Sequence, residues 1–146
     1  MEVHLKHIQE FVKNKAREKW SLDPIINRFI HNNPDKNSAD SWKPAFIHNF
    51  EIYWGKKLIG DIKVFGNEND FSKKAAQILI VLGENRGEGI GTKAINLLLD
   101  KLKTMFTAVY CNVNRYNIAS LKMLRKNGFF IKDLRGNEFI LYKTLI

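Results

Sequence analysis

The stretch that decides the fold reads Leu82-Gly83-Glu84-Asn85-Arg86-Gly87-Glu88-Gly89-Ile90-Gly91-Thr92-Lys93. It follows the continuously apolar run Ile78–Leu82, which is typical of a strand covered on both faces at the centre of a sheet. After it, apolar residues recur with helical spacing at Ile95, Leu98, Leu99, Leu102 and Phe106. A glycine-rich turn between a strand and a helix exposes backbone N–H groups where the helix dipole favours an anion. The stretch therefore predicts a phosphate-binding turn.

Two nucleotide motifs compete for this turn, and spacing separates them. A Walker A loop needs Gly-Lys-Ser/Thr, whereas the order here is Gly91-Thr92-Lys93, which argues against nucleotide hydrolysis. The run from Gly89 to Ala94 satisfies the loose dinucleotide pattern G-x-G-x-x-A. The next strand, Ala108–Val113, carries no acid for a ribose, and too little chain remains for a doubly wound sheet. Neither alternative is favoured.

The first half of the chain predicts two short helices and a hairpin. Leu5, Ile8, Val12 and Ala16 follow a helical period, and Asp23-Pro24 is typical of a helix start. Strands are expected over residues 46–54 and 58–65, joined by a turn at residues 55–57, and a second polar turn at residues 66–70.

The second half predicts a parallel strand pair followed by a final hairpin. Because the strand ending at Leu82 and the strand Ala108–Val113 are joined through a helix, we expect them to be parallel. Asn117 can cap a further helix that ends at Asn127-Gly128. Two last strands, residues 129–132 and 138–144, turn at residues 135–137.

Two motifs in the correct order connect the chain to a known family. Residues 86–91 fit the pattern Arg/Gln-x-x-Gly-x-Gly/Ala without adjustment. A second block, Asn117-Ile118-Ala119-Ser120 followed by Lys126-Asn127-Gly128-Phe129, is close to N-x-A-S…K-x-G-F. Here the sequence resembles the GNAT superfamily of N-acetyltransferases, nearest the branch of ribosomal-protein, aminoglycoside and nucleotide-sugar acetyltransferases. The resemblance covers about the last 70 residues, a stretch long enough to hold both motifs and the elements between them.

The resemblance implies a fold and a coenzyme site. The fold is α/β (α+β), with a mixed, mostly antiparallel sheet, a splayed central pair of parallel strands and flanking helices, in a single domain over residues 1–146. Acetyl-CoA would lie in the V-shaped gap of that pair, as co-substrate. A backbone N–H near Leu82 would polarise the thioester, and the second motif would supply Asn117, Ser120 and Lys126. The residues implied around the pyrophosphate are Arg86, Gly87, Glu88, Gly89, Ile90, Gly91 and Thr92.

The resemblance leaves proton transfer open. Asn117 would orient the pantetheine or its leaving sulfur, besides capping its helix. Many relatives have a carboxylate where this chain has Gln77, and a tyrosine where it has Leu124. The candidates that remain are a water-mediated base, Glu51 or Asp61, or an acceptor amine that arrives neutral. The acceptor would be a primary amine on a small molecule, a nucleotide sugar or a protein N-terminus.

Composition narrows the class of protein without choosing the acceptor. With 45% hydrophobic and 27% charged residues, the sequence is typical of a globular protein, and no apolar run approaches the roughly 20 residues that span a bilayer. The single cysteine, Cys111, excludes an internal disulfide, so we expect a cytoplasmic enzyme. The histidines have no spacing that suggests a metal site. The net charge of +9 is dispersed, so we do not expect a nucleic-acid partner.

Two alternatives to an enzyme stay open at this point. A GNAT-like module could bind an acyl-CoA without catalysis, which the missing family acid and base favour. A basic domain associated with RNA or the ribosome is the other, and salt-dependent binding to nucleic acid distinguishes it.

Overall fold

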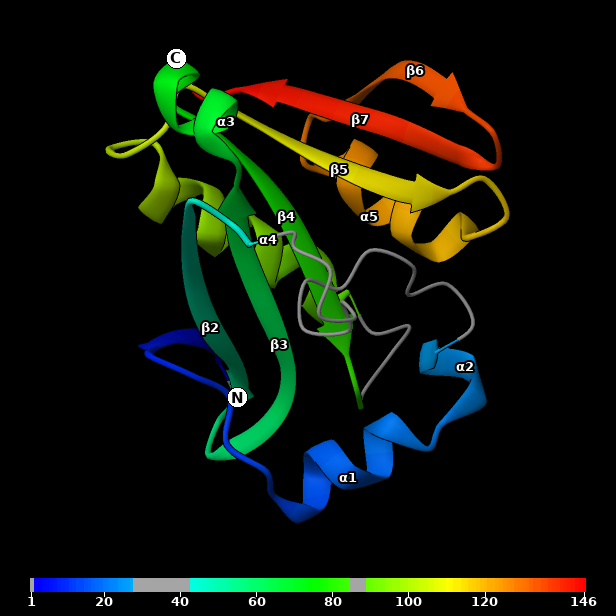
Figure 1. Cartoon of the computed structure of the whole chain (residues 1–146). Helices are drawn as coiled ribbons and strands as arrows, with labels where there is room; N and C mark the ends of the chain where they lie inside the picture. The colour runs from blue at the N-terminus through cyan, green and yellow to red at the C-terminus, as the bar shows by residue number, and fades with distance from the viewer. Residues whose placement is uncertain (1, 28–42, 85–88) are drawn as a thin grey trace.

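The computed structural model describes residues 2–27, 43–84 and 89–146, which form one seven-stranded sheet with helices against it. The strand order is β1-β2-β3-β4-β5-β7-β6 (Figure 1). All neighbouring strands are antiparallel except β4 and β5. In chain order the elements are β1 (Val3–Ile8), α1 (Lys15–Ser21), α2 (Pro24–Asn27), β2 (Phe46–Trp54), β3 (Lys57–Gly66), α3 (Glu68–Lys73), β4 (Ala75–Leu82), α4 (Ile90–Leu102), β5 (Ala108–Asn114), α5 (Ile118–Lys126), β6 (Phe130–Arg135) and β7 (Glu138–Thr144). This arrangement confirms the expected fold class.

The helix expected from Leu5 to Ala16 is wrong. Residues Val3–Ile8 form the edge strand β1, paired antiparallel with β2, and the first helix begins only at Lys15. Val3 and Leu5 alternate with polar residues and pack against the core. In this short stretch the alternation of apolar and polar residues, which is typical of a strand, therefore decides the structure rather than the helical spacing of a few apolar residues. The helix start expected at Asp23-Pro24 is confirmed by α2.

The predicted hairpin is confirmed as β2 and β3, with Gly55 in its turn at φ 60°. The polar stretch after it is not the simple turn expected, because residues 68–73 form α3. The reason is a capping box: the Asn67 side chain accepts from the Asp70 N–H, and the Asp70 carboxylate accepts from the Asn67 N–H. Tyr110 on β5 donates its hydroxyl to the same carboxylate at 2.9 Å, which ties α3 to the sheet.

The main core lies between the sheet and helix α4. Ala94, Ile95 and Leu98 of α4 are fully buried, and they share one cluster with strand residues such as Ile62 and Val109. The predicted apolar face of this helix is thus confirmed, although the helix ends at Leu102 rather than Phe106. Since one cluster includes side chains from β2, β3, β4, β5 and β7, α4 supports both halves of the sheet.

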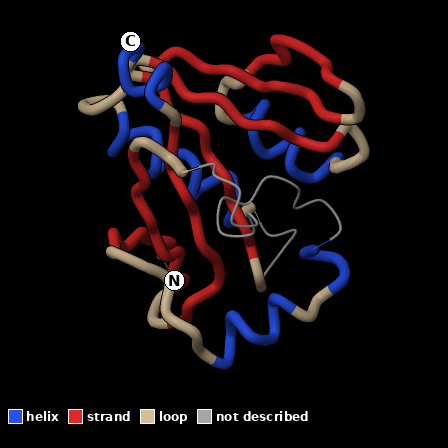
Figure 2. The backbone as a smooth tube through the Cα atoms, in the orientation of Figure 1, coloured by secondary structure: helices blue, strands red, loops and turns tan. Residues whose placement is uncertain are grey.

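The opposite face of the sheet carries α1, whose Trp20 is buried. The indole ring packs directly on Gly83, the residue after β4, so closely that a β-carbon on Gly83 would overlap the ring. Figure 2 shows α1 and α2 at the end of the sheet where β4 finishes. The N-terminal helices are therefore anchored to the residue at which the glycine-rich stretch begins.

The C-terminal helix and hairpin form as predicted, except that β6 runs to Arg135 rather than ending at residue 132. Helix α5 runs to Lys126, and Gly128 then turns the chain with φ 86°. The last hairpin turns at Gly136, φ 59°, and places β7 between β5 and β6. Among the residues that the structure describes, no helix combines the length and the apolar character needed to cross a membrane.

Candidate active site

The two parallel strands separate soon after they begin. The register pairs Ala75 with Ala108, Ala76 with Val109 and Gln77 with Tyr110, and does not continue to the later residues of either strand. Over those residues β4 still pairs with β3 as far as Leu82, and β5 with β7 as far as Asn114. Figure 1 shows the two strands diverging from their shared start. The described part of the chain therefore contains the expected V-shaped gap, with one backbone edge of each strand facing it.

The free edge of β4 presents backbone donors to this gap. The Gly83 N–H donates to the Ile59 carbonyl of β3 at 2.8 Å, so it faces away from the gap. Because successive residues of a strand direct their backbone groups to opposite sides, the N–H groups of Leu82 and Ile80 face β5. A backbone donor is thus placed at Leu82, where the resemblance implies one.

The glycine turn is described only from Gly89 onward. Arg86, Gly87 and Glu88 lie outside the described residues. Gly89 precedes α4 with φ 76°, and a β-carbon placed on it would have no atom within 4 Å. Space is therefore not what requires glycine at position 89. Glycine is favoured at this position by the left-handed backbone conformation, because residues with a β-carbon rarely adopt it.

Gly91, the second residue of α4, packs closely against α5. A β-carbon on Gly91 would lie 2.7 Å from the Met123 sulfur of α5. Nearby, the Asn127 side-chain amide donates to the carbonyls of Thr92, at 3.1 Å, and Met123, at 3.0 Å. These contacts hold the second sequence motif against the first turn of α4. They bring the two blocks together although 25 residues separate them in the sequence.

Asn117 acts as the predicted cap of α5. Its side-chain oxygen accepts from the Ser120 N–H at 3.2 Å, which occupies this oxygen with helix capping. Asn117 lies three residues beyond Asn114, the last residue of β5, so it follows the end of β5 that is not paired with β4.

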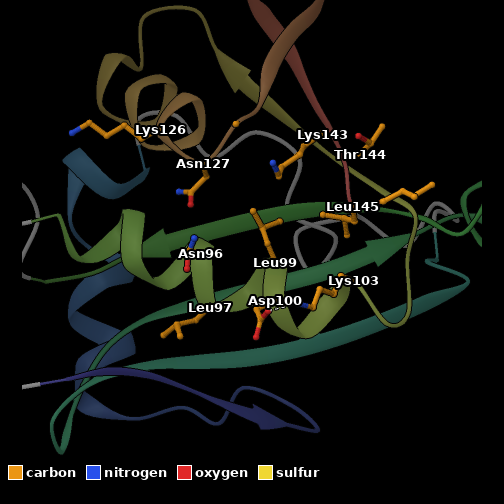
Figure 3. Close-up of a pocket in the computed structure, with 12 residues that line it drawn as sticks. Asn96, Leu97, Leu99, Asp100, Lys103, Lys126, Asn127, Lys143, Thr144 and Leu145 are labelled. Carbon is orange, nitrogen blue, oxygen red and sulfur yellow. Dashed lines mark ion pairs between the residues drawn. The ribbon is translucent and has the colours of Figure 1, made fainter.

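Lys126 lies on the exposed face of α5 and borders a cavity of about 580 Å³ between α4, α5 and β7. In Figure 3 the Lys126 side chain extends away from the other labelled residues, whereas Asn127, just after α5, and Lys143, on β7, lie closer to α4. The Lys143 ammonium lies over Gly128, where a β-carbon would be 2.6 Å from it. The cavity is lined from the middle and last turns of α4 rather than from Gly89, so it is distinct from the glycine turn.

Glu51 and Asp61 form one cluster with a residue that the sequence analysis did not single out. The two carboxylates lie opposite one another on β2 and β3, and Arg17 of α1 reaches both. Its guanidinium donates to Asp61 at 2.7 and 2.9 Å and to Glu51 at 2.6 Å. The Tyr53 hydroxyl donates to Glu51 at 3.0 Å. Neither carboxylate is therefore an isolated base.

The electrostatics of this cluster are set by burial and by Arg17. Burial raises the pKa of Asp61 above its ordinary value, and the hydrogen bonds from Arg17 oppose that rise. The paired carboxylates raise the pKa of Arg17 further above its already high value, with Asp61 the larger contributor. Burial also raises the pKa of Tyr53, helped by its hydrogen bond to Glu51. Arg17 consequently stays charged, and Asp61 is the carboxyl group more easily protonated than usual.

The two departures from the family pattern have different surroundings. Gln77 is half-buried at the vertex of the gap, between Phe65 on β3 and Tyr110 on β5. Leu124 is 1% exposed and belongs to the core cluster, so it packs among apolar side chains. Cys111 is also buried, and burial raises the pKa of its thiol to about 12, which makes it unreactive.

The described residues contain no group of three or more His, Cys, Asp or Glu side chains placed to hold a metal ion. The sequence analysis missed Arg17, and it named Asn127 as a motif residue and a helix end without its contact with α4. Arg17 has no sequence signal, because its carboxylate partners are 34 and 44 residues away. Asn127 did have one, since it lies within the second motif, but the motif alone does not reveal its contacts with α4.

A family model described as an acetyltransferase (GNAT) domain matches residues 4–130 of the chain. None of the curated proteins compared with the chain matches it.

Solved structures share this fold at low sequence identity. A domain from Methanocaldococcus jannaschii superposes with a TM-score of 0.73 at 20% identity, covering 98% of each chain. A spermidine N-acetyltransferase from Vibrio cholerae, in complex with CoA and spermine, gives 0.72 at 16% identity, covering 98% of this chain and 95% of that one. A ribosomal-protein alpha-N-acetyltransferase, RimL, in complex with coenzyme A gives 0.61 at 19% identity, covering 68% of this chain. The match spans 62% of the RimL chain, less than two thirds of its length.

Proposed function

The chain belongs to the GNAT acetyltransferase family, and from this premise we propose that it transfers an acetyl group from acetyl-CoA to a primary amine. The amine is carried by a small molecule, a nucleotide sugar or a protein N-terminus. The observation that carries the proposal is the early separation of β4 and β5, with α4 beginning at Ile90 shortly after β4 ends at Leu82. Structural neighbours that act on spermidine and on a ribosomal protein, and whose structures contain coenzyme A, support it.

The residues around the gap fit an acyl-CoA. In this proposal residues 86–92 hold the pyrophosphate, and the left-handed Gly89 precedes the N-terminus of α4, whose N–H groups favour an anion. The pantetheine follows the free edge of β4 and pairs with its backbone groups. Lys126, at the end of α5, is the proposed partner of a further phosphate.

In this proposal the chain catalyses acetyl transfer mainly by position and by backbone hydrogen bonds. The Leu82 N–H, which faces the gap, donates to the thioester oxygen as negative charge develops there, an effect worth about 3 kcal/mol for one donor. Asn117, at the far end of β5, orients the pantetheine and its leaving sulfur. Holding amine and thioester at attack distance supplies much of the remaining rate.

Proton removal in this proposal occurs before the amine attacks. Each of the four carboxylate oxygens of Glu51 and Asp61 accepts a hydrogen bond from Arg17 or Tyr53, so neither group presents an unpartnered oxygen to an incoming amine. Gln77 cannot remove a proton. The acceptor therefore arrives as the neutral amine, and the coenzyme thiolate takes its proton from solvent because Leu124 cannot supply one.

The test is to incubate the protein with acetyl-CoA and three amines: spermine, ribostamycin and a peptide with a free amino terminus. Thiol release and the mass of the product are followed together. A product heavier by one acetyl group, formed with stoichiometric thiol release, is the expected result. If acetyl-CoA raises the Tm but no amine is acetylated, the chain is a coenzyme-binding module instead. Absence of both effects overturns the proposal.

A further inference from the structure

Asn112 lies where the gap between β4 and β5 begins. It is two residues beyond Tyr110, the last residue of β5 that pairs with β4. Its neighbours Cys111 and Val113 are buried in the core on the α4 side, so Asn112 points to the opposite face of the sheet. Asp61 points to that same face, because the adjacent Ile62 is buried in the core. Asn112 therefore borders the gap on the face that carries the Arg17 cluster.

The side chain of Asn112 makes no hydrogen bond with the described residues. Its carbonyl oxygen Oδ1 is shielded from solvent and has no partner, although the residue as a whole is half-buried. Buried polar atoms are nearly always hydrogen-bonded, and an exception needs a specific cause. The Asn112 oxygen lies at the edge of the gap, and a substrate that donates a hydrogen bond to it there would explain why no protein group does.

Asn49 shows why position matters in this argument. Its Oδ1 is also buried without a partner, but its Nδ2 donates to the Gln9 carbonyl at 2.9 Å. That bond fixes the side chain between β2 and the segment after β1, two strands away from the gap. Asn49 is thus held by a hydrogen bond within the protein and lies away from the gap. Asn112 has no such hydrogen bond and borders the gap.

We propose that Asn112 holds the acceptor amine, its Oδ1 accepting an N–H from the attacking nitrogen. The inference rests on the proposed function and identifies the residue that orients the acceptor. A neutral primary amine attacks with its lone pair, so an acceptor that holds one N–H fixes where the lone pair points. An asparagine suits this task, because it accepts a hydrogen bond at every pH without taking the proton.

The interaction strengthens during the reaction. As the new N–C bond forms, the nitrogen becomes positively charged, and hydrogen bonds from charged donors are stronger than neutral ones. The C–S bond then breaks, its electron pair leaves on the coenzyme sulfur, the nitrogen loses its extra proton to water, and the thiolate takes a proton from water. Because Asn112 contacts the transition state more strongly than the bound amine, its loss lowers kcat as well as raising the KM for the amine.

The experiment uses Asn112→Leu, which keeps the size of the side chain and removes its oxygen, with Asn112→Ala as a second variant should leucine prevent folding. We expect kcat/KM for the most active amine of the panel to fall between about 5-fold and 100-fold, the range for one lost hydrogen bond in a buried site. The KM for acetyl-CoA should stay within twofold, and the Tm should not fall. Asn112→Asp, which keeps an accepting oxygen, should retain more activity than Asn112→Leu above the pKa of the amine.

The matched control is Asn49→Leu, the same substitution on the same face of the sheet. It removes the hydrogen bond to Gln9, so it should lower the Tm while leaving kcat/KM for the amine unchanged. The inference is overturned if Asn112→Leu and Asn112→Ala retain wild-type kcat/KM, or lose affinity for acetyl-CoA as much as for the amine. If the wild-type protein acetylates no amine, the proposed function fails and the role of Asn112 fails with it; normal acetylation by both variants overturns the role of Asn112 alone.

Discussion

Trp20 and Gly83 are in direct contact, and the contact requires glycine at position 83. The indole ring of this α1 residue occupies the place where a β-carbon on Gly83 would be. Trp20 is 4% exposed, so the ring is fully enclosed. Through this contact the N-terminal helix reaches the end of β4, one residue beyond the proposed thioester donor Leu82. The position of α1 and the shape of the proposed site are thereby coupled.

Gly83→Ala should destabilise the protein by about 1–3 kcal/mol, the usual cost of forcing an extra carbon into a packed region. In a Trp20→Leu background the same change should cost less, because the smaller side chain leaves room. Urea unfolding of the four proteins of this double-mutant cycle measures the difference. Equal costs in both backgrounds would show that the ring does not restrict position 83.

Gly89→Val tests the glycine turn against a control with the same backbone strain. Gly89 and Gly136 both have positive φ, 76° and 59°, and a β-carbon at either position would have no atom within 4 Å. Valine at either position should cost about 1–3 kcal/mol of stability. Only Gly89→Val should also raise the Kd for acetyl-CoA, measured by calorimetry. Equal Kd values for the two variants would place the pyrophosphate elsewhere.

Arg17→Leu should leave two carboxyl groups side by side without their cation. Breaking a buried ion pair costs about 3–5 kcal/mol, and we expect about 2–3 here because the three side chains keep between 12% and 15% exposure. Loss of the guanidinium should also raise the pKa of Asp61 further, so the folded variant binds protons that the unfolded chain releases. Its stability should therefore rise relative to wild type as pH falls from 8 to 5. Urea unfolding across this range checks both effects, and a pH-independent difference would contradict the second.

His48 should make the wild-type protein less stable in mild acid. Burial lowers the pKa of His48, and the neighbouring His7 lowers it further. The unfolded chain then takes up a proton near pH 6.5 that the folded protein does not, so stability falls as pH decreases through this value. His48→Phe, which preserves the aromatic contact with Phe106, should flatten the Tm profile between pH 7 and pH 5. An unchanged profile would assign the acid sensitivity to other groups.

The rate of acetyl transfer should follow the neutral fraction of the amine. At subsaturating amine, kcat/KM should rise with pH up to the pKa of the acceptor itself and should shift when an amine of different pKa is used. Gln77→Glu should move the profile to lower pH, since it places a carboxylate at the vertex of the gap. A break in the pH–rate profile at a pKa that does not change with the amine, and that disappears in Glu51→Gln or Asp61→Asn, would instead identify a protein base.

Much of the fold could be predicted because local sequence and tertiary structure agree in the second half of the chain. The apolar run before Leu82, the helical period after it and the capping residue Asn117 each specify one element, and each element forms. The start of the chain could not be predicted in this way. Strand β1 exists because β2 offers it an edge, and that partner is more than 40 residues away in the sequence.

The site was predictable where it depends on backbone and not where it depends on distant side chains. The left-handed Gly89 follows from a glycine placed before a helix. The function of Gly91 was expected beside a phosphate, and the structure adds a packing role against Met123 that no local pattern indicates. Likewise Glu51 and Asp61 were named singly, while their shared partner Arg17 depends on how α1 crosses the sheet.

The short parallel register between β4 and β5 has a consequence for cooperativity. Among the described residues, strand pairing joins β1–β4 to β5–β7–β6 through three residue pairs, Ala75–Gln77 with Ala108–Tyr110. The two halves are also joined by the Tyr110–Asp70 and Thr107–Lys74 hydrogen bonds beside this register, and by the apolar contact of both with α4. A ligand that pairs with the edges of both strands would replace the missing part of the ladder. Slowed amide hydrogen exchange on both sides of the gap, far beyond the atoms the ligand touches, would then report a sheet that unfolds as one unit rather than two.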